Sequence, residues 1–452
     1  MLSITDDLKA KLLDYNTTNS LQIVVYGEGL FRTIITEDNI VSESMVLKQS
    51  ICDEERIRFG GCIASEFSIQ LMNTEDMTFA GNSIGPNAVS LQNKYIEVRL
   101  IQEYVDKPLY PRRDLYPSKN LFPGYTKGYQ QVTIFYGKIA SCERQQDNRN
   151  VFNITAYDPI SELFDIDVSN QLNKLFTNGR ATIDTLAALC LNGIDYDPND
   201  FERQGFSDWM QLVNHDWESS NEKITKRKLL RDVCEFCAGY GFYRPSERKF
   251  RLFKHDDGIR GSEIYESYEN FYFQDGHMGS YTGIIFNYAG DISVDRNDKN
   301  KQWGGKIGYF DENCFEELEE VKTEIGDNAY CYDMTDNILA YDYSDSKTPY
   351  YNLSTIKTIY YLFKNSMILS GEDLYTPMQL TAEGKIWVEV GDTVKIIEPV
   401  TNIYGEYITS SGEVTDNYDN AAKTTYTSRV LSRTLTGIKA LTDTIEAKGE
   451  IT

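Results

Sequence analysis

The chain has 452 residues, 41% of them hydrophobic and 13% aromatic, which suffices for about three packed domains and argues against disorder. Its 45 Lys and Arg residues against 69 Asp and Glu residues give a formal net charge of −24 at pH 7. This acidic balance argues against broad binding to a phosphate backbone, but it suits a passage through which nucleic acid slides without sticking. The eight cysteines are scattered without a disulfide framework, which indicates a reducing compartment.

Neither a secretion signal nor a membrane span is recognisable in the sequence. Residues 1–7 are acidic and contain no apolar stretch. The most apolar helical stretch, 356–369, contains Lys357 and Lys364 and is too short to cross a bilayer. We therefore expect a protein that folds in a cytoplasm and has no stable membrane association.

Residues 1–160 predict an N-terminal β-domain, an antiparallel barrel or sandwich over about 20–160 that follows a short polar helix or arm over 1–19. Apolar side chains alternate with polar ones in five runs, at Leu21/Ile23/Val25, Phe67/Ile69/Leu71, Ile96/Val98/Leu100, Val132/Ile134 and Phe152/Ile154/Ala156. Gly137 is expected to mark a bulge or bend, and Pro159 to end the last strand. A proline- and tyrosine-rich stretch over 105–130 is predicted to be a loop that either contacts a partner or packs on its own subunit.

Residues 161–255 change to a helical period and predict a small α+β domain. Thr182 is a suitable N-cap for a helix over 183–191, with Gly193 as its stop. Thr225 is expected to cap a second helix that ends before Gly239. A hairpin then turns 242–243 onto 250–253.

Residues 256–452 predict a second β-domain with acidic loops and an inserted helix over 352–368. Apolar residues alternate over 386–390, before Gly391-Asp392, and again at Val394 and Ile396. This spacing predicts two short strands that fold around a tight turn. A further β-rich run covers 427–437.

Several motifs in both halves resemble one protein family. They are Phe59-Gly60-Gly61-Cys62-Ile63-Ala64-Ser65-Glu66-Phe67, Phe135-Tyr136-Gly137-Lys138-Ile139 with Ile154-Thr155-Ala156-Tyr157-Asp158, and the Gly391-Asp392 turn followed by Val430-Leu431-Ser432-Arg433-Thr434-Leu435. Their order is similar to that in tail or baseplate hub proteins of tailed phages and phage-derived injection particles of Gram-positive bacteria, and the likeness covers most of the chain.

The resemblance implies two tube-like antiparallel β-barrel domains with a small α+β domain between them. No sequence repeat is visible, but the two barrels would share a fold. Three chains would form a pseudo-sixfold ring that joins a hexameric tail tube to a trimeric spike or tip. The channel surface is expected to be acidic.

The resemblance also implies a structural protein of the virion tail, made in the host cytoplasm, without enzymatic activity, cofactor or metal. Its partners would be two further copies, a tail tube or distal tail protein, a spike or tip protein, a tape-measure protein and baseplate wedge proteins, with DNA only passing through. In families where a lysin or fibre domain is fused, it follows the hub-like strands; none is recognised after them here, at Thr452, so any hydrolase or spike is expected on a separate chain.

Two motifs that carry chemistry in other proteins are present without their usual context. Cys234 and Cys237 form a CxxC, but no second pair completes a zinc site and the pair lies late in a predicted helix, so core packing is favoured. Gly81-Asn82-Ser83-Ile84-Gly85 matches GxSxG, yet Pro86 follows where a helix should begin, so a β-turn is favoured.

Three weaker patterns have structural interpretations. Gly27-Glu28-Gly29 lacks the third glycine of a dinucleotide loop, where Arg32 stands. Asp195, Asp197 and Asn199 have calcium-loop spacing, but Asp200 and Phe206 replace the required glycine and glutamate, which favours an Asx-rich turn. The acidic run 316–320 is expected to be a solvated helix face.

Ten basic residues cluster in the otherwise acidic chain: Lys223, Lys226, Arg227, Lys228, Arg231, Arg244, Arg248, Lys249, Arg251 and Lys254. The cluster predicts either a solvated basic helix face, which is favoured, or a patch that docks an acidic surface of another subunit.

Two other functional classes remain open from the sequence. A tail-associated cell-wall hydrolase or peptidase would need a nucleophile–base or metal set, and the three histidines offer few candidates. A virion glycan-binding β-protein would use the exposed tyrosine-rich loops.

Overall fold

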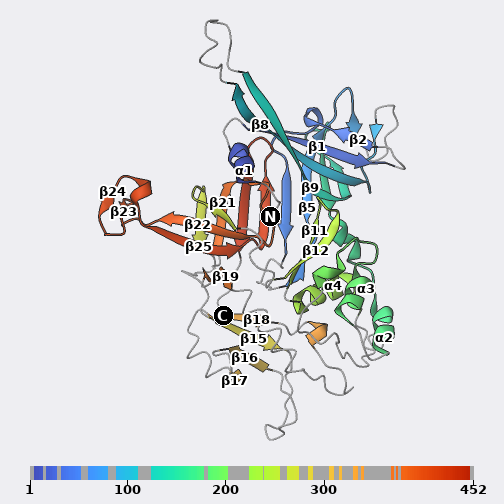
Figure 1. The fold of residues 1–452 in the computed structure, drawn as a ribbon. Helices are drawn as coiled ribbons and strands as arrows, with labels where there is room; N and C mark the ends of the chain where they lie inside the picture. The colour runs from blue at the N-terminus through green and yellow to red at the C-terminus, as the bar shows by residue number, and fades with distance from the viewer. Residues whose placement is uncertain are drawn as a thin grey trace.

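The computed structural model describes residues 5–13, 17–27, 32–51, 60–79, 88–109, 124–177, 182–201, 223–237, 239–254, 262–273, 283–288, 305–309, 315–317, 329–333, 337–340, 368–370, 373–374 and 378–447. Strands dominate this part of the chain (Figure 1), so the predicted mainly β fold is confirmed. The helices are α1 (Asp6–Leu12), α2 (Ser169–Thr177), α3 (Ile183–Cys190) and α4 (Lys226–Phe236). None of the described helices has the length and apolarity that crossing a bilayer requires.

An antiparallel sheet of eleven strands forms the centre of the molecule, in the order β14-β21-β27-β26-β3-β5-β10-β9-β8-β1-β2. Seven strands come from the N-terminal part: β1 (Thr18–Tyr26), β2 (Arg32–Ile35), β3 (Val46–Ser50), β5 (Glu66–Met72), β8 (Tyr95–Leu109), β9 (Gly124–Arg144) and β10 (Val151–Tyr157). Four come from the C-terminal part: β14 (Asn270–Phe273), β21 (Met378–Glu383), β26 (Ser432–Thr436) and β27 (Thr442–Ala447). The two ends of the chain therefore share one sheet.

The N-terminal strands form where alternating apolar residues predict them. In β5, Phe67, Ile69 and Leu71 are buried while their neighbours are more exposed, so one face of the strand packs on the core. Gly137 is not at a bulge: the pairing of β9 shifts register elsewhere, at Val98/Arg99 on β8 and at Thr155/Ala156 on β10. A Cβ at Gly137 would lie 2.2 Å from the carbonyl oxygen of Tyr157, so glycine is required by the close approach of β10.

The predicted loop over 105–130 is shorter than the sequence indicates. Residues 105–109 extend β8, and 124–130 belong to β9, so both ends of the stretch form a long antiparallel hairpin. The prolines and tyrosines of this stretch interrupt the alternation of apolar and polar residues that would indicate strands in the sequence. Residues 110–123 lie outside the described part.

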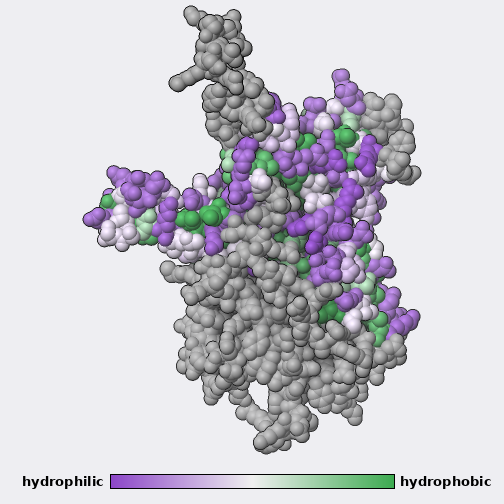
Figure 2. Space-filling model, viewed as in Figure 1, coloured by the Kyte–Doolittle hydropathy of each residue, from purple (hydrophilic) through white to green (hydrophobic). Residues whose placement is uncertain are grey.

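A second sheet, β13-β22-β25, contacts the C-terminal strand β14 through the ring of Tyr426, whose centroid lies 5.6 Å from that of Phe271 and 5.0 Å from that of Phe273. It contains β13 (Ser262–Tyr265), β22 (Thr393–Pro399) and β25 (Lys423–Arg429). Only 266–269 separate β13 from β14, and only 430–431 separate β25 from β26, so the chain passes from one sheet to the other at two short connections. Between β22 and β25, residues 400–422 form an arm that stands clear of the body (Figures 1 and 2).

The same order of four strands occurs twice in the large sheet. The N-terminal repeat is β3-β5-β10-β9 and the C-terminal repeat is β14-β21-β27-β26; in each, the spatial order follows the first, second, fourth and third strand of the chain. In each repeat a long hairpin leads into the third strand, β8 with the first part of β9, or β22 with β25. The two halves therefore have equivalent strand topology without a visible sequence repeat.

No closed barrel is found among the described strands. The sheet has two outer strands, β14 and β2; the chain after β2 returns to β5 through an isolated bridge between Ile40 and Leu71 and a few hydrogen bonds, not through a strand ladder. The predicted pair of separate barrels differs from this arrangement because β3 pairs with β26 of the other repeat.

The segment 161–255 packs beside the N-terminal repeat. Thr182 and Thr225 cap α3 and α4 as predicted, accepting the backbone N–H of Thr185 and Lys228, and Gly193 has a positive φ of 102°. The predicted hairpin is β11 (Gly239–Arg244) with β12 (Lys249–Lys254), and β4 (Gly61–Cys62) adds a parallel strand to it. The domain boundaries at 160 and 255 stay predictions.

The remaining described elements are short. A four-stranded sheet has the order β17-β16-β15-β18, with β15 (Gly283–Tyr288), β16 (Gly305–Tyr309), β17 (Phe315–Glu317) and β18 (Ala329–Asp333). Small pairs are β6 (Thr78–Phe79) with β7 (Ala88–Val89), β19 (Ile368–Ser370) with β20 (Asp373–Leu374), and β23 (Tyr407–Ile408) with β24 (Val414–Thr415). The 3-10 turns are η1 (Glu37–Asn39), η3 (Pro159–Leu163), η4 (Pro198–Phe201), η5 (Ile338–Ala340) and η6 (Tyr418–Asn420).

Three predictions for the C-terminal part are not confirmed. Residues 315–317 form strand β17, so the predicted helix face over 316–320 is wrong at its start. The predicted helix over 352–368 lies outside the described residues, apart from Ile368, which begins β19. Residues 386–390 are not a strand: their apolar side chains are buried together instead of alternating, and only the strand after Gly391, β22, is present.

Candidate assembly interface

The two repeats are joined by the pairing of β3 with β26. The register runs from Val46 opposite Thr436 to Ser50 opposite Ser432, and it places the buried Leu47 opposite the buried Leu435. The pairing continues beyond β3, because the N–H of Ile51 donates to the carbonyl of Leu431. An apolar cross-strand pair and a backbone ladder thus hold the first strand of one repeat to the third strand of the other.

Glu43 secures one end of this junction. Its carboxylate accepts the backbone N–H of Ile438 at 2.8 Å and of Lys439 at 3.1 Å, in the turn between β26 and β27. Burial alone would raise the pKa of Glu43, but these backbone donors outweigh it and hold the pKa below its usual value. The turn needs Gly437, which has a φ of 84° and whose Cβ would meet the carbonyl oxygen of Ala440.

The solvent side of the two repeats is polar. We call this surface the polar face: it comprises the outward side chains of β14, β21, β27, β26, β3, β5, β10 and the last four residues of β9. Cross-strand partners form a continuous row across it, through Asn270, Thr381, Thr444, Thr434, Lys48 and Glu66. Its charged residues are Lys48, Glu66, Glu143, Glu383 and Glu446, so one positive and four negative charges give −3.

Each repeat leaves one strand edge open. In the described part of the chain, β14 pairs only with β21, and Ser141–Arg144 at the end of β9 pairs only with β10. These are the first strand of the C-terminal repeat and the third strand of the N-terminal repeat. They are the counterparts of β3 and β26, which pair with each other inside the chain.

A buried arginine holds the irregular segment 384–392 against the sheet. Arg433 donates from Nε to Oδ1 of Asp443 at 2.7 Å and from Nη2 to Oδ2 at 2.9 Å. The same guanidinium donates to the carbonyl oxygens of Lys385, at 2.7 Å, and of Val388. Asp443 also accepts the backbone N–H of Lys385 at 2.9 Å. Side chains therefore satisfy the backbone groups that a neighbouring strand would otherwise satisfy, which explains how the segment is buried without being a strand.

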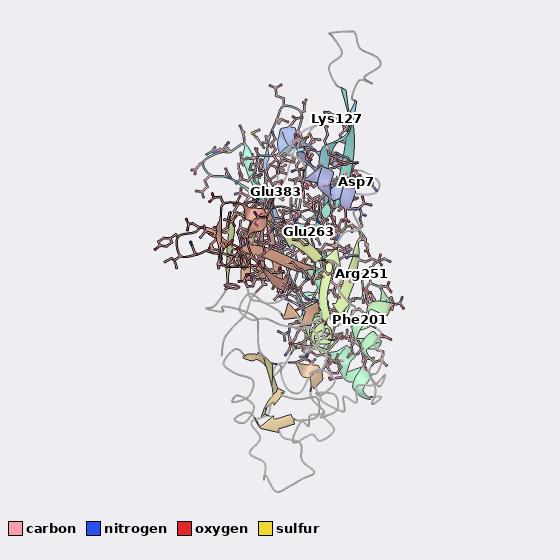
Figure 3. All side chains as sticks on the ribbon, turned by 60° about the vertical axis from the view of Figure 1, so that its left-hand side comes forward. Asp7, Lys127, Phe201, Arg251, Glu263 and Glu383 are labelled. Atoms are coloured by element: carbon pink, nitrogen blue, oxygen red, sulfur yellow. The ribbon has the colours of Figure 1, made fainter. Side chains whose placement is uncertain are left out.

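Glu263 connects helix α1 to the C-terminal repeat. It accepts hydrogen bonds from Nζ of Lys385 at 2.8 Å, Nζ of Lys9 at 3.1 Å and Nε1 of Trp387 at 3.0 Å. Burial would raise its pKa, but these three donors keep the pKa below the usual value. Figure 3 shows Glu263 in the central part of the molecule, between Asp7 of α1 and Arg251 of β12.

Glu97 connects the segment 161–255 to the N-terminal strands. It accepts Nε of Arg99 at 2.7 Å, Nη2 of Arg248 at 2.6 Å and the hydroxyl of Tyr26. Arg248 lies in the turn between β11 and β12, with its guanidinium 4.7 Å from the ring centroid of Tyr136. Burial opposes ionisation, yet the hydrogen bonds lower the pKa of Glu97 to about 2.

Most residues of the basic cluster predicted from the sequence make contacts with other residues of the same chain. Arg251 pairs with Asp200 at 2.7 Å, and Arg244 pairs with Glu389 at 2.9 Å. Others of the ten make contacts to carboxylates, a carbonyl or an aromatic ring: Lys226, Arg227, Arg231 and Arg248. The interpretation as a solvated basic helix face is wrong for Lys226, which is buried, and for Arg244 and Arg251, which pair with carboxylates of other segments. Lys223 and Arg227 are exposed, as a solvated face predicts.

The other sequence candidates have structural roles where they are described. Cys234 and Cys237 are buried at the end of α4, as core packing predicts, and burial raises the pKa of Cys234 well above its usual value. Asp197 accepts the N–H of Asn199 in an Asx turn. Residues 81–85, 28–29 and 206 lie outside the described part. Among the described residues, no group of three or more His, Cys, Asp or Glu is arranged to hold a metal ion.

Sequence reasoning missed the residues that hold the interface together. Arg433 lies in a motif that the family resemblance singles out and Asp443 follows that motif, but nothing local marks the two as a buried pair. Alternation does give a signal for the polar face, since Thr434, Thr436, Thr442 and Thr444 alternate with buried residues. The pairing of β3 with β26 has no local signal at all.

No protein-family model and no curated protein matches this sequence. Among solved structures, the chain is similar to the 43 kDa tail protein of prophage MuSo2 from Shewanella oneidensis. The sequence identity is 10% and the TM-score 0.46, with 95% of this chain and 98% of that chain covered. At this level the similarity assigns neither a family nor a function.

Proposed function

We propose that this chain is a structural protein of a phage or phage-derived tail. It acts as a tail or baseplate hub, three copies of which close a pseudo-sixfold ring between a hexameric tail tube and a trimeric spike or tip. The observation that carries the proposal is the junction of β3 with β26, which joins two repeats of equal strand order in one sheet. Three chains with two repeats each supply the six units that a sixfold neighbour requires.

The open edges support a ring made of identical contacts. A head-to-tail contact that repeats the internal junction pairs β14 of one copy with the end of β9 of the next. Such heterologous contacts close into a ring when the rotation between units is right. In this contact β14 takes the role of β3, and the end of β9 takes the role of β26. If the registers within the two repeats are aligned by their buried residues, Phe273 is expected opposite Arg144, and Tyr272 opposite Gln145, of the next copy.

The polar face lines the channel in this proposal. The hydroxyl, amide and carboxylate groups of this face can hydrogen-bond to water. The face also has a net negative charge, which disfavours retention of DNA. The role requires no bond-making chemistry. The resemblance of the sequence motifs to hub proteins adds the proposed neighbours: a tail tube or distal tail protein, a spike or tip protein, a tape-measure protein and wedge proteins, all in the virion tail.

A disulfide test addresses the ring and its register together. Tyr272→Cys combined with Gln145→Cys should give covalent trimers under oxidation, because the two side chains face each other only across the proposed contact. Tyr272→Cys with Asp147→Cys is the matched control and should stay unlinked. Light scattering of the wild-type chain should give a trimer, and electron micrographs should show rings with an axial channel. A monomeric chain without cross-links would refute the proposal.

A further inference from the structure

Two equivalent hydrogen bonds align the repeats residue by residue. After β5, the N–H of Asn73 donates to the carbonyl of Asn150 at 2.9 Å; after β21, the N–H of Gly384 donates to the carbonyl of Leu441 at 2.8 Å. Strand β21 therefore corresponds to β5, and the hairpin β26-β27 corresponds to the hairpin that the end of β9 forms with β10.

The alignment gives Phe273, on the open edge of β14, a counterpart in the internal junction. Phe273 pairs with Met378 of β21. Leu47 of β3 pairs with Phe67, the residue of β5 that Met378 matches in this alignment. Phe273 therefore corresponds to Leu47.

Arg144, on the other open edge, has a counterpart in the same junction. It pairs with Phe152 of β10. Leu435 pairs with Asp443, the residue of β27 that Phe152 matches in this alignment. Arg144 therefore corresponds to Leu435, so in the proposed ring Arg144 of one copy faces Phe273 of the next.

A half-buried group of rings surrounds Phe273. We call it the aromatic cluster, and it consists of Tyr268, Phe271, Phe273 and Tyr426. The ring centroid of Phe273 lies 5.3 Å from that of Phe271 and 5.0 Å from that of Tyr426, and Tyr268 lies 5.9 Å from Phe271. Leu47, the counterpart of Phe273, is 2% exposed in a junction where β26 pairs with β3. The partial exposure of the aromatic cluster is that of a junction whose second strand comes from another copy.

The surroundings of the aromatic cluster favour a cation. The faces of aromatic rings are electron-rich. Burial, followed by the negative charge of Glu398 on β22, raises the pKa of Tyr268 and of Tyr426, so this carboxylate acts on both hydroxyls. Among the residues that the structure describes, no Lys or Arg lies over the four rings and none pairs with Glu398; Lys423 lies over Tyr418 instead.

Arg144 supplies a cation that has no carboxylate partner in the described part of its own chain. Its side chain is exposed, and its guanidinium carbon lies 5.2 Å from the ring centroid of Phe152. Successive side chains of a strand point to opposite faces, so Glu143 lies on the polar face and Arg144 on the other face. The turn that follows has no net charge, since Asp147 and Arg149 offset each other. This edge therefore presents a positive charge on the side of Phe152.

We propose that Arg144 of one copy binds the aromatic cluster and Glu398 of the next copy. The guanidinium lies between Phe152 of its own copy and Phe273 of the next, and its N–H groups donate to Glu398. Arginine suits this contact because its planar group stacks on rings and still donates to a carboxylate. Since the internal junction has leucines at these positions, the charged contact also distinguishes the edges that pair between copies from those that pair within the chain. The inference rests on the proposed ring.

A charge exchange tests the contact in the full-length chain. Arg144→Glu alone and Glu398→Arg alone should each raise the concentration at which half of the trimer dissociates by about tenfold or more, because every ring contains three such contacts. The variant with both substitutions should return to within about threefold of the parent, since each contact again joins opposite charges. Additive losses in the double variant would overturn the contact, as would single variants that dissociate like the parent.

A neutral substitution separates the cation from the rest of the side chain. Arg144→Met keeps an unbranched side chain next to Phe152 and should weaken the trimer to a similar extent, without lowering the melting temperature of the separated chain. Arg32→Met is the matched control and should leave dissociation unchanged. Arg32 is also exposed and lies over a ring of its own chain, 5.3 Å from the centroid of Tyr26.

The disulfide between positions 272 and 145 distinguishes failure of this contact from failure of the ring. A parent chain that forms trimers and this disulfide, but dissociates no more readily after the changes at Arg144 and Glu398, would overturn the contact and leave the ring intact. A parent chain that stays monomeric and forms no such disulfide would overturn both.

Discussion

Replacing Arg433 tests whether a buried ion pair holds the C-terminal repeat together. Arg433→Met removes two hydrogen bonds to the buried Asp443 and the donors to the carbonyls of Lys385 and Val388. An uncompensated buried carboxylate costs about 3–5 kcal/mol, and each unsatisfied buried carbonyl about 1–3 kcal/mol before water enters. We expect a loss of about 4–6 kcal/mol, a large part of the stability of a typical domain.

The assay is urea unfolding followed by the fluorescence of Trp387. This indole is buried and donates to Glu263 at 3.0 Å, so it reports on the core next to the segment 384–392. The other three of the four tryptophans are replaced by phenylalanine to isolate the signal. The midpoint for the Arg433→Met variant should fall well below that of the parent, while Arg149→Met, at an exposed turn, should match the parent.

The double variant Arg433→Met/Asp443→Leu separates the ion pair from the rest of the effect. Because it removes both charges, it should recover about 2 kcal/mol relative to Arg433→Met alone. A loss below about 1 kcal/mol in the single variant would refute the reasoning, as would additive losses in the double variant.

Three further predictions concern other parts of the molecule. Gly137→Ala should destabilise the N-terminal strands by about 1–3 kcal/mol in thermal unfolding, because the new Cβ would lie 2.2 Å from the carbonyl oxygen of Tyr157; an unchanged melting temperature would contradict this. Glu97→Gln should be less stable than the parent at pH 7, and the difference should shrink as pH falls from about 5 towards 2. The reason is that a folded pKa of about 2 gives stability that is present above the unfolded value and lost on acidification; a constant difference between the urea midpoints would argue otherwise. Glu383→Lys with Glu446→Lys changes the charge of the polar face from −3 to +1, so the trimer should retain DNA in a mobility-shift assay at low salt where the parent does not.

Local features of the sequence predict much of the secondary structure. Alternation identifies β1, β5, β8 and β10, since each strand buries one face on the core. Thr182 and Thr225 mark the starts of α3 and α4, because a capping hydroxyl acts on backbone groups within three residues. These predictions depend on neighbours along the chain, which the sequence displays directly.

The same logic fails where a residue's environment comes from distant segments. Residues 386–390 alternate like a strand, but Arg433 and Asp443 take the backbone partners that a strand would use. Gly137 looks like a bulge, yet the constraint on it is the backbone of β10. The basic cluster looks solvated, although Arg244, Arg248 and Arg251 pair with carboxylates of distant segments.

By itself, the sequence determined a mainly β chain, acidic overall, with capped helices in the middle and strands at both ends. Only the tertiary structure decided that β3 and β26 meet and merge the two ends into one sheet with two open edges. The physical reason is that hydrogen bonding along a strand edge is made by backbone groups common to all residues. Which edges pair therefore depends on how whole strands are packed, not on local side-chain patterns.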